Sequence, residues 1–197
     1  MDQSVASREA LQGNQMSRRG RLRFKSAQTF FVTTTVVNFA AVFREDRYCE
    51  ILVRNIKHYQ QRYRFRILAY VIMPSHFHWV VHTDPKIGTI SDIMRDIKKY
   101  SAWDIMSELE SAGQSNLIRM FEAEAGDITD QRRKFWMRRF DDRIIRSTRM
   151  LRTVIEYIHR NPVKAGLVDG VTDYKYSSAR NYLLNDHSML EVITDWI

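Results

Sequence analysis

Two histidines separated by one apolar residue, His76-Phe77-His78, are the residues whose types and spacing are best suited to chemistry. Alternate side chains of a strand point to the same face, so these imidazoles project together, with Cα atoms roughly 7 Å apart. Imidazole commonly binds divalent metals, and two on one face can form two corners of a metal site. His82 follows on the same face, but it lies too far along the strand to join them. It is expected to be a packing or surface histidine.

Tyr100 is the candidate nucleophile, on an expected helix after the histidines. A phenol ionises near pH 10 in water, so its attack on a phosphate needs help from a divalent metal. Lys98 and Lys99 can neutralise phosphate charge. Asp104, four residues later on the same helix face, is the candidate third metal ligand, and Asp96, four residues earlier, is its rival. Taken alone, Tyr100 can equally be an amphipathic residue at the border of the core.

The composition points to a polyanionic partner. The chain has 197 residues, and its 31 basic and 23 acidic side chains give a net charge of +8. This charge favours nucleic acid first and an anionic membrane surface second. The single cysteine, Cys49, excludes an internal disulfide and is expected to be buried. No apolar run approaches the ~20 residues that span a membrane and no segment resembles a signal peptide, so a cytoplasmic protein is expected.

Basic residues concentrate in two segments. One ends the polar stretch 1–26, which is either a flexible tail or an arm that contacts phosphates; its cations are Arg18, Arg19, Arg21, Arg23 and Lys25. The other is 131–149, where Trp136 and Phe140 are interleaved with cations. Single-stranded nucleic acid suits such a surface because bases stack on rings, although the four-residue spacing of the two rings equally fits core packing. The expected DNA-binding residues are Lys98, Lys99, Arg132, Arg133, Lys134, Arg138 and Arg139.

Hydrophobic periodicity predicts the elements that must position these residues. Strands are expected at 29–37, 65–73 and 76–83, with an edge strand within 135–145, and helices at 45–63, 89–109 and 151–161. Residues 110–130 read as a loop with, at most, a short helix. Pro74-Ser75 joins an antiparallel strand pair. Asn161-Pro162 is expected to end the last helix, and Gly166 to terminate a further short turn.

This order of elements predicts an α+β domain with a ferredoxin-like antiparallel sheet. We expect helices packed mainly on one face and a C-terminal helical extension. The expected organisation is a flexible basic tail at 1–26, a catalytic domain at 27–183 and a C-terminal tail at 184–197.

Several stretches together resemble the single-tyrosine transposases of the His-hydrophobic-His (HUH) type, and within them the branch of REP-associated tyrosine transposases. The stretches are YVIMPSHFHW at 70–79, SDIMRDIKKY at 91–100, FWMRRFDD at 135–142, YIHRNPVKAGLV at 157–168 and YSSA at 176–179. The short His-Phe-His is a weak motif by itself. Its order and spacing relative to Asn-Pro-Val-Lys-Ala-Gly-Leu-Val make the signature specific.

The resemblance implies that His76 and His78 bind Mg²⁺ or Mn²⁺ and that Tyr100 attacks a DNA phosphodiester. The products are a 5′-phosphotyrosine link and a free 3′-hydroxyl, so a strand can later be rejoined. Relatives often carry a third, polar ligand one helical turn beyond the tyrosine, which here is Asp104. Ser75 stands where many relatives have Asn, a difference that can alter how the turn holds His76.

The implied activity is that of a DNA transposase or endonuclease acting on single-stranded DNA with hairpins or palindromic repeats, as a monomer or homodimer. The alternative is a non-catalytic DNA- or RNA-binding regulator on the same fold.

Overall fold

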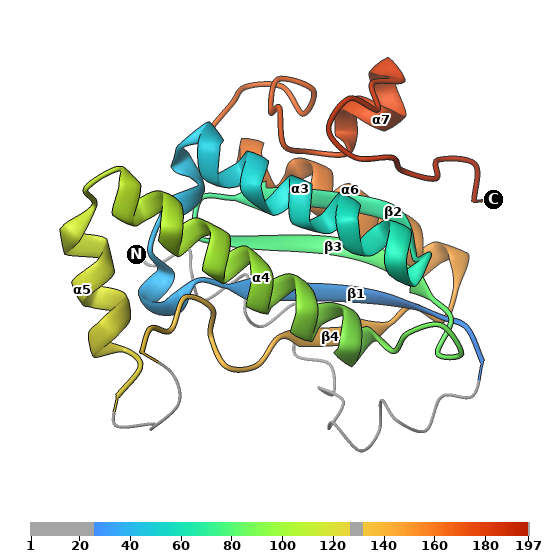
Figure 1. The fold of residues 1–197 in the computed structure, drawn as a ribbon. Helices are drawn as coiled ribbons and strands as arrows, with labels where there is room; N and C mark the ends of the chain where they lie inside the picture. Colours follow the sequence, from blue (N-terminus) through green and yellow to red (C-terminus); the bar gives the residue numbers. More distant parts are fainter. Residues whose placement is uncertain (1–25, 127–131, 197) are drawn as a thin grey trace, which may run out of the picture.

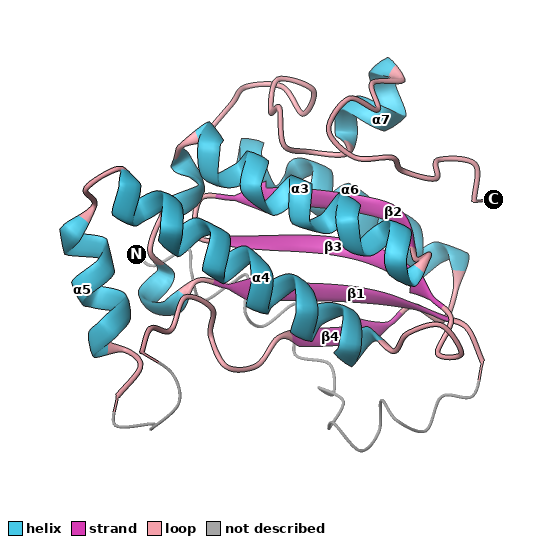
Figure 2. Cartoon of the chain, viewed as in Figure 1, coloured by secondary structure: helices cyan, strands magenta, loops and turns pink. Residues whose placement is uncertain are grey.

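A four-stranded antiparallel sheet forms the centre of the chain (Figure 1, Figure 2). The computed structural model describes residues 26–126 and 132–196, so the basic cluster at 18–25 lies outside the described residues. The strands are β1 (Gln28–Thr35), β2 (Arg66–Met73), β3 (His76–Thr83) and β4 (Asp141–Ile144), in the spatial order β2-β3-β1-β4. β2 and β3 form a hairpin with Pro74-Ser75 as its two-residue turn, as predicted.

Helices cover both faces of this sheet. They are α3 (Asp46–Tyr63), α4 (Ile90–Ser111), α5 (Ser115–Ala123), α6 (Thr148–Lys164) and α7 (Ala179–Leu184), with short 3₁₀ turns η1 (Val37–Phe39) and η2 (Val42–Arg44). In Figure 1, α3 and α4 cross the front of the sheet and α6 lies behind it. The predicted α+β class is therefore confirmed, with α3 and α4 on one face of the sheet and α6 on the other.

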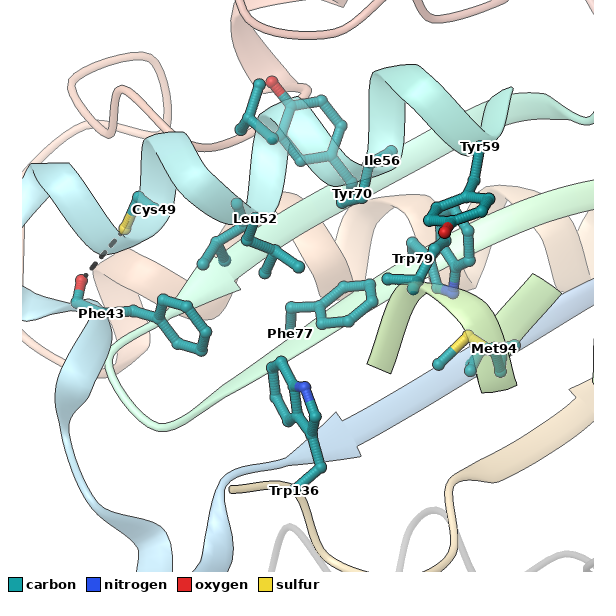
Figure 3. Packing of buried hydrophobic residues seen from close by; sticks show 14 of the residues in the cluster. Phe43, Cys49, Leu52, Ile56, Tyr59, Tyr70, Phe77, Trp79, Met94 and Trp136 are labelled. Carbon is teal, nitrogen blue, oxygen red and sulfur yellow. Dashed lines mark hydrogen bonds between the residues drawn. The ribbon is translucent and has the colours of Figure 1, made fainter. Parts of the chain in front are cut away.

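The alternation of β3 divides its side chains between the two layers. Phe77, Trp79 and Val81 enter the larger core beneath α3 and α4. Figure 3 shows the first two of these side chains among their neighbours. The even-numbered residues of β3, which include His76 and His78, point to the opposite face of the sheet and therefore face α6. A smaller core joins the apolar side of α6 to this second face, through Leu68, Val71, Val80, Leu151, Val154, Ile155 and Ile158.

Most helix boundaries follow the predicted signals. Thr89 caps α4, and Asp92 completes a capping box with it. Trp136 is buried in the larger core and donates from Nε1 to Ser101 Oγ at 3.1 Å, while Phe140 packs against the same core. For these two rings, core packing is therefore the alternative that the fold supports.

Two elements differ from the predictions. α6 does not end at Asn161 but continues through Pro162 to Lys164, where Gly166, with φ of 64°, closes it. A proline removes one backbone donor, and this loss is tolerable here because the helix ends within the next turn. The expected edge strand within 135–145 is paired as β4 only over four residues.

The C-terminal segment packs back on β2, as its aromatic content suggested. Ser178 N donates to Tyr70 O at 2.9 Å, and Ile193 N donates to Ile67 O at 2.9 Å. The segment thus covers an edge of the sheet that would otherwise expose unpaired backbone groups.

Within residues 26–126 and 132–196, none of the helices combines the length and apolar character needed to cross a lipid bilayer.

Candidate active site

The two histidines of β3 lie side by side on the α6 face of the sheet. Their ring centroids are 4.7 Å apart, and His78 is only 5% exposed. Nδ1 of His78 is 2.7 Å from the hydroxyl of Thr33, its neighbour on β1, and Nδ1 of His76 is 3.2 Å from the hydroxyl of Ser75. Each hydroxyl can accept the Nδ1 proton, and in that tautomer each Nε2 keeps its lone pair for a ligand.

Burial keeps both imidazoles neutral. Desolvation lowers the pKa of His76 to about 4. The same cause, with a smaller contribution from neighbouring His76, holds the pKa of His78 well below its ordinary value. Neutral imidazole is the form that binds metal ions, so the site is in its ligating state at neutral pH.

A tyrosine from α6 reaches this pair. The ring centroid of Tyr157 lies 5.5 Å from that of His78, and Phe31 contacts both rings at 6.0 Å and 5.7 Å. Tyr157 stands on the helix face that packs on the sheet, between the buried Val154 and Ile158. The fold therefore places a phenol beside the histidines.

Two polar residues extend the site toward the end of α6. Asn161 lies one helical turn beyond Tyr157, and its Nδ2 donates to Tyr157 O at 3.1 Å. Within the described residues, the side-chain oxygen of Asn161 accepts no hydrogen bond, so it can serve as an oxygen ligand. The ammonium of Lys164 lies 6.0 Å from the centre of the Tyr157 ring and can attract a phosphate there.

Tyr100, the predicted nucleophile, is not brought to the histidines. It lies on α4, on the opposite face of the sheet, where it packs against the larger core. Its ring neighbours are Tyr59 at 5.7 Å and Trp103 at 5.2 Å. The expected convergence of Tyr100 with His76 and His78 is therefore corrected: within this chain, the sheet separates them.

The two carboxylates considered as third ligands also lie on the α3–α4 side. Asp104 Oδ2 accepts a hydrogen bond from Asn55 at 2.8 Å, and so links α4 to α3. Asp96 accepts from Tyr63 at 2.5 Å and from Arg95 at 2.8 Å. Neither faces the histidines, because both belong to the helix that covers the other side of the sheet.

Sequence reasoning missed Tyr157 and Asn161, although a signal for both was present. They belong to the stretch Tyr-Ile-His-Arg-Asn-Pro, and their four-residue spacing places them on one helix face. In the fold, the apolar stripe of α4 packs on the face of β3 that carries Phe77 and Trp79, and α6 covers the face that carries the histidines.

Six of the seven expected DNA-binding residues, all but Arg139, line a groove of about 1030 Å³ elsewhere, between α4 and residues 132–138. Lys98 Nζ donates to Met137 O at 2.7 Å, and burial lowers its pKa to about 8. Arg133 pairs with Glu110 and Glu122, and Lys134 lies 4.0 Å from Glu124. The remaining cations of this set are exposed: Lys99, Arg132, Arg138 and Arg139.

The donor set around the histidines fits a divalent cation with nitrogen and neutral oxygen ligands. Among the described residues, no group of three or more His, Cys, Asp or Glu side chains could hold a metal. His76 and His78 nevertheless offer two neutral nitrogens with engaged Nδ1 atoms, and Asn161, one helical turn beyond Tyr157, is the candidate for a third, oxygen donor.

The sheet thus carries a histidine pair that faces a helix-borne tyrosine, and the comparisons with known proteins identify the family. The sequence model described as "Transposase IS200 like" matches residues 31–161, which include His76, His78 and Tyr157. The match covers more than half of the chain, so the chain belongs to the IS200-like transposase family.

Two curated relatives carry a narrower description. The chain is 29% identical over 118 residues to a putative REP-associated tyrosine transposase of Haemophilus influenzae, covering 60% of this chain and 61% of that protein. It is 28% identical over 114 residues to the REP-associated tyrosine transposase of Escherichia coli strain K12, covering 58% of this chain and 54% of that protein. The alignments thus span little more than half of these relatives.

A solved structure shares the fold. It is a REP-associated tyrosine transposase bound to a REP hairpin, superposed with a TM-score of 0.63 at 24% identity. The match covers 90% of this chain and 99% of that one. The α+β architecture is therefore that of a known transposase.

Proposed function

We propose that this protein is a metal-dependent transposase or endonuclease that nicks and rejoins single-stranded DNA at hairpins of palindromic repeats. The observation that carries the proposal is the 5.5 Å contact between the Tyr157 ring and the His78 ring. The hairpin substrate is inferred from the REP hairpin bound by the structural relative.

In the proposed reaction, Tyr157 in place of Tyr100 is the nucleophile. Its phenol oxygen loses a proton and forms a bond to phosphorus, while the bond from phosphorus to the 3′ oxygen breaks and that oxygen takes up a proton. The result is a 5′-phosphotyrosine and a free 3′-hydroxyl. Attack by a 3′-hydroxyl on the phosphotyrosine reverses these bond changes and rejoins a strand.

The chain's own residues prepare this step in three ways. His76, His78 and Asn161 would hold Mg²⁺ or Mn²⁺, which when bound polarises the phosphate and stabilises the departing oxygen. Phe31 packs against the Tyr157 ring and limits its movement. Lys164 attracts the phosphate from the open end of α6.

Every proposed catalytic group comes from one chain, so the chemistry needs no residue from a second copy. This supports the monomer among the two states expected from the sequence. A homodimer remains compatible, provided that each copy keeps its own site.

The test is transfer of a labelled DNA strand to the protein. A hairpin-bearing single strand is incubated with purified protein and Mn²⁺ or Mg²⁺, and covalent adducts are separated under denaturing conditions. A label at the 3′ end should move to the protein band, because the tyrosine keeps the 5′-phosphate of the downstream fragment. A label at the 5′ end should stay with free DNA.

Two tyrosine variants form the matched pair for this assay. Tyr157→Phe should abolish the adduct, whereas Tyr100→Phe should retain it, since that ring lies across the sheet. If Tyr157→Phe still forms the adduct, Tyr157 is not the nucleophile. Binding without any adduct across metals and several hairpins would instead favour a non-catalytic regulator.

A further inference from the structure

An exposed tryptophan stands on the basic groove between α4 and residues 132–138. Trp103 is 59% exposed, an unusual position for the largest apolar side chain. Two neighbours contact the ring: Tyr100 forms a T-shaped pair with it at 5.2 Å, and Lys99 Nζ lies over it, 4.6 Å from its centre. The ring therefore has two partners and still exposes more than half of its surface.

The groove beside Trp103 carries a strong excess of positive charge. Among the described residues, six cationic side chains and one carboxylate, Glu110, line it. Arg133 is engaged by Glu110 and Glu122, and Lys98 by backbone carbonyls. Within the residues the structure describes, Lys99, Arg132 and Arg138 form no ion pair and stay available to a polyanion.

The groove lies at the same end of the sheet as the histidine pair. Met137, on the wall of the groove, donates from N to Thr35 O at 2.8 Å, and Thr35 pairs with His76 across β1 and β3. Two strand spacings therefore separate Met137 from His76, a distance on the order of 10 Å. A strand lying in the groove can reach the active site around this end of the sheet.

We infer that this groove is a second nucleic-acid site, which binds unpaired DNA flanking the hairpin by stacking a base on Trp103 and pairing phosphates with Lys99, Arg132 and Arg138. An aromatic platform among cations suits a single strand, because unpaired bases offer free faces for stacking. A protein partner would gain little from so many unpaired cations. The inference rests on the proposed function for its substrate class, single-stranded DNA.

The experiment measures DNA binding by full-length protein that cannot cleave. Tyr157→Phe protein in EDTA is titrated into a fluorescently labelled blunt hairpin and into the same hairpin with unpaired 5′ or 3′ extensions. Trp103→Ala should weaken binding of an extended hairpin about 5- to 150-fold and leave the blunt hairpin unchanged. Trp103→Phe should restore most of the affinity, since it keeps an aromatic face.

A charge variant and its matched control test the pairing with phosphates. Arg132→Ala with Arg138→Ala should reduce the slope of log affinity against log salt by about 1.4 for an extended hairpin, since each phosphate that is no longer neutralised lowers the slope by about 0.7. Lys86→Ala with Arg119→Ala removes the same charge from exposed positions outside the groove and should leave that slope unchanged.

Three results would overturn the proposed role of the groove. Trp103→Ala could weaken binding of the blunt and the extended hairpin equally, or it could weaken neither. The third result is tighter binding of an RNA of the same sequence. The proposed function is judged separately, by the covalent adduct. If wild-type protein forms the adduct while the groove variants bind normally, the groove is not a DNA site and the proposed function is retained. If no adduct forms but these variants lose affinity for the extensions, the groove is a DNA site and the proposed function is rejected.

Discussion

At the scale of single residues, Thr33 contacts His78, the more deeply buried histidine of the proposed metal site. Its hydroxyl lies 2.7 Å from Nδ1 of His78. Thr33→Val keeps the β-branched shape and removes this bond, so the ring loses its preferred tautomer and orientation. Mn²⁺ affinity should fall about 10- to 100-fold, measured by titration calorimetry.

The chain offers a matched control four residues away on the same strand. Thr29 contacts His82 through the same pair of atoms, at 2.9 Å, on the same two strands and the same face. Thr29→Val should leave Mn²⁺ affinity unchanged because His82 is not a proposed ligand. Equal loss in both variants would mean that the threonines act through the strand and not through the metal site.

At the scale of elements, a buried hydroxyl links α6 to the sheet in addition to the apolar packing between them. Ser178 Oγ donates to Tyr70 O at 3.2 Å and accepts from Tyr70 N at 2.9 Å. It also lies 2.8 Å from Nε2 of His159 on α6, two residues beyond Tyr157. The segment Tyr-Ser-Ser-Ala therefore connects the C-terminal extension, β2 and the helix of the proposed nucleophile.

Removal of this hydroxyl should loosen the connection. Ser178→Ala removes the hydrogen-bond partner of Tyr70 N and of His159 Nε2, which costs about 1–3 kcal/mol in the free energy of unfolding. Urea denaturation measures the loss, and Ser107→Ala, at an exposed position of α4, is the control. A stability equal to wild type would show that water replaces the hydroxyl and that α6 is held by apolar packing alone.

Sequence periodicity predicted most of the helices and strands, but it did not predict which helix covers which face of the sheet. Alternation along β3 separates Phe77 and Trp79 from His76 and His78 without any tertiary information. It cannot say which helix covers which parity, since that depends on how the chain crosses from β4 to α6. Tyr100 and Tyr157 both follow the histidines on amphipathic helices, so their periodicity could not distinguish them.

At the scale of the whole molecule, burial of neutral histidines makes folding sensitive to acid. Desolvation lowers the pKa of His76 and of His159 to about 4, and it holds that of His78 well below its ordinary value. An unfolded chain restores each to about 6.5. Between these values the unfolded chain binds protons that the folded chain excludes, so acid favours unfolding.

Stability in metal-free buffer should therefore be full above about pH 6.5 and fall as the pH drops toward 4, by up to about 1.4 kcal/mol per pH unit for each histidine. Carboxylates such as Asp92 and Asp96, whose pKa lies below the ordinary 3.8 because of their hydrogen bonds, act only at lower pH. Urea denaturation at several pH values measures the slope. His159→Asn should flatten it by one histidine's share, and an unchanged slope would mean that His159 is protonated in the folded protein.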